Sequence, residues 1–559
     1  MVGPLLALVP AQQMLVPAAP RATLMRVAAA PGSAPSVAVR AAAPAAAVTR
    51  LQSDLERLIQ SPGWNGDRWS VMVVSLDKGD TLFSHGADEA VAPASNLKLF
   101  TTAAALYYLG PQFRYNTYLL SDARIENGVL NGDVIVYGTG DPSFSGRFGR
   151  RDAIWHAFAD TLAAMGVKEI RGDVIGDASY FKGPGNGAGW QEDYINASYA
   201  APASALTYAE NIATLRIKPA PAAGAHPQIT LVDGAEGMSV VNEAQTVARG
   251  RSWINATRTS YDGPILVRGQ ISRSTVAIQR TIPVADPAQY AAAVFRQILI
   301  DKGVNVTGAP RSVTREEDSP VTGRAVFAPA FDSKTPLRVL AIHQSPPLIE
   351  IVDIINKKSH NLFAEQTIRT LGRITEGEGS VAAGHHAIEQ LFTRETGSLP
   401  ETLHMDDGCG LSVLDRTSAR TMITLLSFMA RTPVFDAYYS TLPEAGVSGG
   451  LRRMYGTKAQ NNLRAKTGTI NNVSSLSGYV TSANGERLAF SIISNNVPST
   501  WRAKRVEDAI GARLAAYNRD NDVAGISAAD LGKTPPKVSK KSTKRGSAAK
   551  RSTSRRTRR

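Results

Sequence analysis

The sequence predicts an α/β fold in which both ends of the chain build one domain and a large β-rich insertion lies between them. Three observations support this prediction. Near the N-terminus, two short strands are followed by a helix, and near the C-terminus a strand hairpin is followed by another helix. Between these parts, residues 116–339 contain many short β-rich runs broken by Gly, Pro, Asn and Asp.

The N-terminal part of the predicted domain covers residues 51–115. A helix is expected over residues 51–60, because leucines recur there three and four residues apart. Two strands are expected at 71–76 and 81–85, on either side of a polar turn. A second helix with an apolar stripe is expected over residues 94–109.

The insertion, residues 116–339, is predicted to be a separate module of two subdomains. One subdomain combines 116–219 with 282–339, and the other covers 220–281. An amphipathic helix is expected at 288–302. The expected strands include 134–137, 229–232 and 275–278.

The C-terminal part of the domain covers residues 340–520. Asn484 and Gly485 lie between two strand-like runs and predict a hairpin. The expected helices are 347–372, 379–396, 418–431 and 502–517.

The formal net charge of +14 is concentrated at the C-terminus. Between Lys533 and Arg559 there are twelve Lys or Arg and no Asp or Glu, so subtracting these twelve from +14 leaves a nearly neutral +2. Residues 521–559 are therefore interpreted as a disordered basic tail. A nucleic-acid partner is not expected, because the tail lacks interleaved aromatic residues and the rest of the chain is nearly neutral.

Residues 1–50 are rich in Ala, Pro and Val and contain no acidic residue, so we interpret them as a leader or degraded signal region that is disordered. No run of 18 apolar residues exists, and no transmembrane segment is expected. Cys409 is the single cysteine, which excludes an internal disulfide. We expect it to be a small buried residue, because a catalytic cysteine needs a histidine partner.

The first motif with chemical meaning is Ser95-Asn96-Leu97-Lys98. On a helix, residues three apart share a face, so Lys98 can approach the Ser95 hydroxyl. A serine needs a base to become nucleophilic, and a desolvated lysine with a lowered pKa can serve. Ser95 follows Pro93, as expected at a helix start, where unpaired backbone N–H groups can stabilise an oxyanion.

Two further motifs follow in the chain. Ser359-His360-Asn361 comes just after a helical stretch, and its hydroxyl and amide can both point into a cleft if the backbone there is extended. Lys466-Thr467-Gly468-Thr469 lies at the end of a strand that enters the hairpin. Gly468 lets a ligand approach that strand closely, and Lys466, Thr467 and Thr469 offer a cation and hydroxyl donors to a carboxylate.

Each motif alone is short enough to occur by chance, but the order S-x-x-K, S-x-N, K-T-G is the pattern of penicillin-binding proteins and related β-lactamases. From about residue 51 to 517 the chain resembles the penicillin-binding protein 4 type D-alanyl-D-alanine carboxypeptidase/endopeptidases. The segments that carry the resemblance are A-P-A-S-N-L-K-L-F-T-T-A-A-A-L, Y-G-T-G-D-P-S-F, G-W-Q-E-D, Y-A-A-P-A-S-A-L, N-K-K-S-H-N-L-F-A-E and R-A-K-T-G-T. The long chain between Ser95 and Ser359 is also similar to that family, which carries extra domains there.

The resemblance implies a penicillin-binding or β-lactamase-like transpeptidase domain and a serine acyl-enzyme mechanism. Ser95 would attack the carbonyl between two D-alanines, Lys98 would take its proton and Ser359 would relay a proton to the leaving amine. Asn361 would hold the substrate backbone, and Lys466 would support this network. Thr467 and Thr469 would hold the terminal carboxylate, and the N–H groups of Ser95 and Thr469 would form the oxyanion hole.

The resemblance also implies that Asp193 binds the amino group of a diaminopimelate side chain, with Tyr199 as a neighbouring aromatic. Where the family usually reads D-G-S-G-L-S-R, this chain reads D-G-C-G-L-S-V at 407–413. Val413 replaces an arginine, for which Arg416 or Arg420 could compensate. His360 occupies the middle of S-x-N and is expected to face solvent.

The resemblance thus implies peptidoglycan peptides as substrates, β-lactams as inhibitors and a periplasmic, secreted or cell-envelope location. The alternatives are a β-lactamase and a non-catalytic cell-wall-binding or interaction protein; the second should have lost Ser95 or Lys98, and both are present. Neither a cofactor nor a metal is expected, because His385, His386 and His404 lack the spacing of a zinc site.

Overall fold

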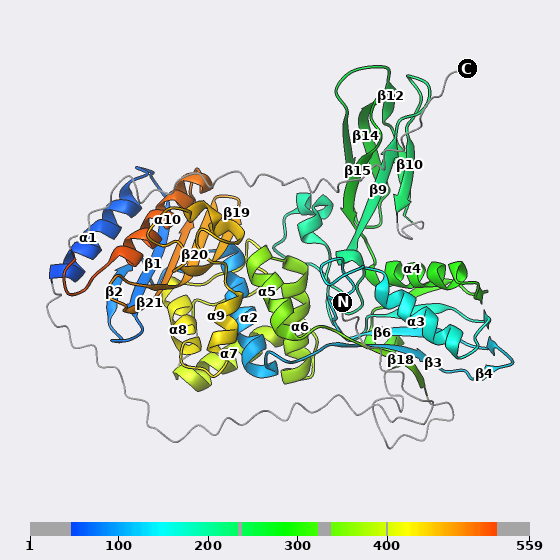
Figure 1. Cartoon of the computed structure of the whole chain (residues 1–559), viewed down its shortest axis with the longest axis horizontal. Helices are drawn as coiled ribbons and strands as arrows, with labels where there is room; N and C mark the ends of the chain where they lie inside the picture. Colours follow the sequence, from blue (N-terminus) through cyan, green and yellow to red (C-terminus); the bar gives the residue numbers. More distant parts are fainter. Residues whose placement is uncertain (1–45, 233–237, 322–336, 398–400, 523–559) are drawn as a thin grey trace, which may run out of the picture.

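The computed structural model describes residues 46–232, 238–321, 337–397 and 401–522 (Figure 1). The expectations for most of the leader and of the basic tail lie outside these residues. The first helix, α1 (Ala46–Gln60), begins ahead of the expected position 51, and its apolar face includes buried Val48. Among the described residues, no helix is both long enough and apolar enough to cross a membrane.

The central sheet joins the two ends of the chain. Its strand order is β19-β20-β21-β1-β2, and all neighbours are antiparallel. Strand β1 pairs along its whole length with β21, from Arg68 opposite Asn495 to Ser75 opposite Leu488. The strands are β1 (Arg68–Ser75), β2 (Thr81–His85), β19 (Arg464–Ile470), β20 (Val473–Thr481) and β21 (Arg487–Asn495). The expected hairpin at Asn484 and Gly485 thus connects β20 to β21.

Both faces of this sheet are covered by helices (Figure 1). Because side chains alternate along a strand, Val71 and Val73 pack in the core under α1 and α10 (Thr500–Ala516), whereas Met72 packs in the helical core on the other side. That second core surrounds α2 (Lys98–Leu109), whose residues from Lys98 to Leu106 are all buried. The other helices of this core are α5 (Leu348–Lys358), α6 (Asn361–Glu376), α7 (Val381–Thr396), α8 (Ala419–Met429) and α9 (Phe435–Thr441).

The insertion departs from the sequence prediction in two elements. A helix that the periodicity did not predict, α3 (Ala153–Ala164), buries Trp155, Phe158 and Leu162 against the insertion's own core. The strand expected at 275–278 begins only at Ile278, because the N–H of Thr275 donates to the carbonyl of Ser272 and closes a turn there.

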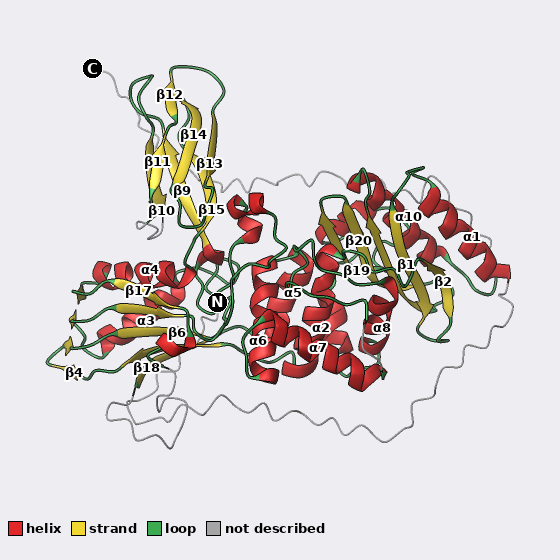
Figure 2. Cartoon of the chain, turned by 180° about the vertical axis from the view of Figure 1, so that it is seen from behind, coloured by secondary structure: helices red, strands yellow, loops and turns green. Residues whose placement is uncertain are grey.

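Among the described residues, the other four sheets are built by the insertion together with β18, which runs past the expected boundary at 339, and Figure 2 shows two of them in an all-strand lobe that projects from the molecule. The two sheets outside this lobe pack with α3 and α4 (Pro287–Asp301). Their strands are β3 (Asn116–Ser121), β4 (Ile125–Glu126), β5 (Val129–Leu130), β6 (Val134–Gly138), β7 (Glu169–Ile170), β8 (Val174–Asp177), β16 (Asn305–Val306), β17 (Pro310–Val313) and β18 (Arg338–Gln344). The lobe contains β9 (Ile212–Lys218), β10 (Gln228–Val232), β11 (Val240–Asn242), β12 (Gln245–Val247), β13 (Trp253–Thr257), β14 (Ile265–Ser272) and β15 (Ile278–Pro283). The exact domain boundaries stay predictions.

One buried ion-pair group ties α1 to α10. The guanidinium of Arg513 in α10 donates to Asp54 of α1 at 2.8 Å and to Asp522, and all three side chains are at most 2% exposed. Removing one partner of a buried pair leaves the other charges uncompensated.

We therefore expect Arg513→Leu to lower the free energy of unfolding by about 3–5 kcal/mol, measured by urea denaturation. Arg57→Leu is the matched control, because Arg57 contacts the same carboxylate of Asp54 but is 71% exposed. Its cost should stay within about 1 kcal/mol. If the two substitutions lower the free energy of unfolding equally, burial of the Arg513 ion pair does not determine its contribution.

Candidate active site

Ser95 lies on a 3₁₀ turn that leads into α2. The turn, Ala94–Leu97, follows Pro93, and Ala94 has a left-handed φ of 48°. In a 3₁₀ turn, residues three apart are eclipsed. This geometry places the amine of Lys98 over the Ser95 hydroxyl, and the Lys98 Nζ donates to Ser95 Oγ at 2.9 Å.

The amine of Lys98 is fully enclosed by protein. Besides Ser95, its nitrogen contacts Asn361 Oδ1 at 2.7 Å and the carbonyl of Cys409, so it has three polar partners. The side chain is 0% exposed. Burial lowers the pKa of Lys98, and the nearby carboxylates of Asp407 and Glu365 only partly offset this effect.

The second motif occupies a break between two helices. Helix α5 ends at Ser359, which adopts a left-handed conformation with φ 56° and ψ 45°, and α6 begins at Asn361. The helix expected over 347–372 is therefore two helices, and the backbone at Ser359 is not extended as expected. The left-handed residue turns the chain so that Ser359 and Asn361 both line the same cleft as Ser95.

The third motif places a second buried lysine next to Ser359. The Nζ of Lys466 donates to Ser359 Oγ at 2.9 Å and to the carbonyl of Thr467 at 2.7 Å. Lys466 is 0% exposed. Burial lowers its pKa well below the ordinary lysine value, and the positive charge of Lys98 lowers it further.

Strand β19 packs directly on the turn that carries Ser95. A Cβ at Gly468 would lie 2.9 Å from the Ser95 nitrogen and 2.8 Å from the Pro93 carbonyl oxygen, so only glycine allows this approach. The Asn96 amide also donates to the Lys466 carbonyl at 2.7 Å, in the orientation that satisfies both of its polar atoms. Because β19 is an edge strand of the sheet, its outer side meets the cleft at Thr469.

The cleft has a volume of about 690 Å³. Ser95, Ser359, Asn361 and Thr469 line it together with Asp193, whose carboxylate is the one charged side chain among the described lining residues. Tyr199 also lines the cleft and is 54% exposed. Lys98, Lys466, Thr467 and Gly468 are not among the lining residues; Thr467 is half-buried and the other three are buried.

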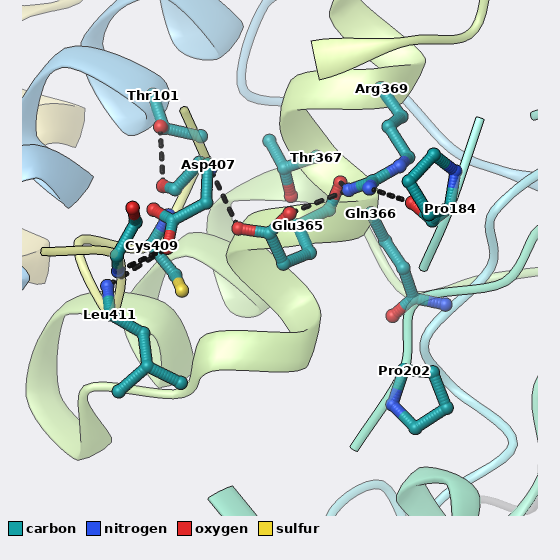
Figure 3. Close-up of polar contacts among 12 residues, drawn as sticks. Thr101, Pro184, Pro202, Glu365, Gln366, Thr367, Arg369, Asp407, Cys409 and Leu411 are labelled. Carbon is teal, nitrogen blue, oxygen red and sulfur yellow. Dashed lines mark hydrogen bonds and ion pairs between the residues drawn. The ribbon is translucent and has the colours of Figure 1, made fainter. Parts of the chain in front are cut away.

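A polar cluster that the motifs did not predict holds the loop that carries Cys409 (Figure 3). The carboxylate of Asp407 accepts the backbone N–H groups of residues 409–412 and the indole N–H of Trp190. The N–H of Gly408 donates to Glu365, which is paired with Arg369 at 2.6 Å. These bonds fix the carbonyl of Cys409 toward Lys98. An aspartate ahead of two glycines is the sequence signal that could have indicated this turn.

The same cluster contains the group of described residues whose spacing could hold a metal ion: Glu365, Asp407 and Cys409, with ligand atoms within 4.8 Å of one another. The donor set does not fit a cation well, because the carboxylates already accept hydrogen bonds from protein N–H groups. Burial also raises the pKa of the Cys409 thiol well above its usual range, which keeps it protonated.

The model of the D-Ala-D-Ala carboxypeptidase 3 (S13) family matches residues 51–517, which include all three motifs. The chain belongs to this family. The predicted family, hydrolase class and α/β fold are thereby confirmed, whereas the roles of individual residues stay predictions.

The matches to three similar proteins extend over most of this chain. It is 33% identical over 502 residues to a D-alanyl-D-alanine carboxypeptidase of Actinomadura sp., covering 87% of this chain and 88% of the relative. It is 25% identical over 437 residues to D-alanyl-D-alanine carboxypeptidase DacB of Haemophilus influenzae, and the match covers 76% of this chain and 85% of that relative. The crystal structure of penicillin binding protein 4 from Haemophilus influenzae shares the fold, with a TM-score of 0.67 at 24% identity, covering 83% of this chain and 97% of that one.

Val413 and His360 are two residues at which the chain departs from the family pattern. Val413 is 38% exposed, and neither proposed substitute for the missing arginine lines the cleft. Arg416 donates to the carbonyls of Val413 and Asp415, and Arg420 pairs with Asp88. His360 was expected to face solvent, and this was wrong: its side chain is 11% exposed because Glu210 and Phe363 cover it.

The buried position of Cys409 generates a labelling prediction. Its side chain is 0% exposed and its thiol pKa is raised, so the native protein should not react with iodoacetamide at pH 8. In urea, one carbamidomethyl group per chain should be added, because the chain has one cysteine. Intact-protein mass measures both. Labelling of the native protein at the rate of a free thiol would contradict the buried loop.

Proposed function

We propose that this chain is a serine-type D-alanyl-D-alanine carboxypeptidase that acts on peptidoglycan stem peptides through an acyl-enzyme on Ser95. The observation that carries the proposal is the 2.9 Å hydrogen bond between Lys98 Nζ and Ser95 Oγ, made by an amine with no solvent contact. A lysine of lowered pKa beside a hydroxyl is a base matched to that nucleophile.

Acylation would begin when the neutral amine of Lys98 takes the proton of Ser95 as its Oγ attacks the carbonyl between the two D-alanines. The backbone N–H groups of Ser95 and Thr469 would stabilise the oxyanion. As the C–N bond breaks, the leaving amine needs a proton. Ser359 can relay it, because its hydroxyl lies 2.9 Å from Lys466 Nζ and lines the cleft.

Substrate would lie along the outer side of β19. An extended peptide can pair with such an edge strand through its backbone. Thr467 and Thr469 would hold the terminal carboxylate through their hydroxyl groups, with Thr469 on the cleft wall. The amide nitrogen of Asn361 donates to the Tyr199 carbonyl at 2.8 Å and has a second N–H for the substrate backbone.

The carboxylate of Asp193 supports recognition of a substrate amino group at the far end of the cleft, beside Tyr199. Water would then hydrolyse the acyl-enzyme. If the leaving amine belongs to a cross-bridge rather than to a terminal D-alanine, the same steps give endopeptidase activity. A substrate in the cell wall implies a location outside the cytoplasm, in the periplasm or elsewhere in the cell envelope, and the named activity of the relatives supports both proposals.

The first test is intact-protein mass after incubation with benzylpenicillin, with Ser95→Ala as the control. We expect one penicillin per chain on the wild type, because the acyl-enzyme should hydrolyse slowly, and none on the variant. Rapid loss of penicillin without a lasting adduct would make the chain a β-lactamase. Absence of both adduct and turnover would favour a non-catalytic wall-binding protein.

The rate of acylation should depend on pH through Lys98. Its pKa is lowered, so the amine is neutral above the lowered value and protonated below it. The acylation rate constant, measured with a fluorescent penicillin, should therefore rise with pH and level off below the ordinary lysine value of 10.5. A rate that keeps rising up to that value would show that the base is an ordinary lysine.

A further inference from the structure

The middle residue of the second motif is held by the insertion. His360 Nε2 lies 2.8 Å from the carboxylate of Glu210. Glu210 belongs to the short turn Ala209–Asn211, directly before β9 in the chain. The N–H of Phe363 donates to His360 Nδ1, so the ring proton is on Nε2 and is donated to Glu210. The two residues flanking His360 are Ser359 and Asn361, which line the cleft.

Glu210 is itself fixed from several sides. Its carboxylate accepts from Ser145 Oγ at 2.8 Å and from Arg147 at 2.9 Å. Burial opposes ionisation, but the bonds from His360 and Arg147 outweigh it and lower the pKa of Glu210 to about 2. The carboxylate is therefore ionised and acts as a fixed acceptor for His360, whose own pKa is lowered by burial.

The backbone at Glu210 is strained. Ala209, Glu210 and Asn211 have φ values of 49°, 59° and 58°, a left-handed run that non-glycine residues rarely adopt. The side chain of Asn211 holds this run by donating to the Pro202 carbonyl at 2.8 Å and accepting the N–H of Tyr208. Strain of this kind persists where the surroundings over-determine it, and it clusters at functional sites.

The same stretch of the insertion also contacts α6 at two further points. The carbonyl of Tyr199 accepts from Asn361, and the carbonyl of Ser204 accepts from Gln366 at 3.2 Å. The N-terminus of α6, which carries half of the second motif, is thus held by residues of the insertion as well as by Lys98 of its own domain.

We propose that Glu210 is a positioning residue for the acylation step: by holding His360, it sets the Ser359 hydroxyl and the Asn361 amide against the two buried lysines. The inference rests on the proposed function, because it concerns the rate of the same reaction. Small displacements of aligned groups reduce the rate of a chemical step much more than they reduce binding.

The test compares Glu210→Ala, His360→Ala and the double variant in the full-length protein. The readouts are release of D-alanine from an N-acylated peptide ending in D-Ala-D-Ala, and the acylation rate with benzylpenicillin. We expect kcat of Glu210→Ala to fall about 10- to 100-fold, with KM changed less than about twofold. The double variant should be no slower than the slower single variant, because Glu210 acts through His360.

Two more variants separate positioning from folding. Glu210→Gln keeps the shape and one acceptor for His360, so its kcat should lie between those of the wild type and Glu210→Ala. Glu243→Ala is the matched control, because it removes another Glu–Arg pair of the insertion, with Arg268, far along the chain from the motif. Its kcat and melting temperature should equal those of the wild type.

The outcomes for the two proposals are distinguishable. If the wild type reacts and Glu210→Ala has an unchanged kcat, or if the effects of Glu210→Ala and His360→Ala multiply, the positioning role is overturned and the proposed function stands. A rise in KM alone overturns it as well. If the wild type neither releases D-alanine nor forms an adduct, both proposals fail.

Discussion

Two lysine side chains without solvent contact, Lys98 and Lys466, impose the strictest constraint on this structure. Removing an ammonium group from water costs several kcal/mol, so each needs a complete set of acceptors. The acceptors come from the turn of Ser95, the break between α5 and α6, the loop after Asp407 and the backbone of β19. The cost of burial and the lowered pKa have the same origin, so the burial that would allow Lys98 to act as a base also makes its surroundings intolerant of change.

The parts that meet at Ser95 are far apart in the sequence. Lys98 bonds Asn361 and Cys409, which are 263 and 311 positions away. Because Gly468 has no side chain, β19 packs closely against the turn that carries Ser95. The site therefore exists only after both ends of the chain have joined in one sheet. Contacts of such long range form late in folding because the loops between them must close first.

Local pattern predicted much of this molecule. The hairpin at Asn484 and Gly485, the helix that follows Ser95 and the order of the motifs depend on neighbouring residues, and these elements lie where they were expected. What could not be predicted depends on distant partners. His360 is buried because Glu210, 150 positions away, covers it. The left-handed Ser359 interrupts an apolar periodicity that reads as one helix. The cluster around Asp407 also needs the indole of Trp190, 217 positions away, and the bond from Gly408 to Glu365, 43 positions away.

The two edges of the central sheet are not alike. At one edge, β2 is a short strand, and its pairing with β1 is interrupted by a register shift at Val73 and Val74. At the other, β19 pairs regularly with β20 from Arg464 to Ile470. An open, regular edge is a template for aggregation, and short or bulged edges prevent sheets from joining. A chain that pairs with β19 in this protein meets no matching edge at β2. Sheet-to-sheet growth between copies would therefore stop after one step. The outer side of β19 is also covered at its start, where Arg464 pairs with Glu444, so the stretch exposed to a neighbouring copy is short.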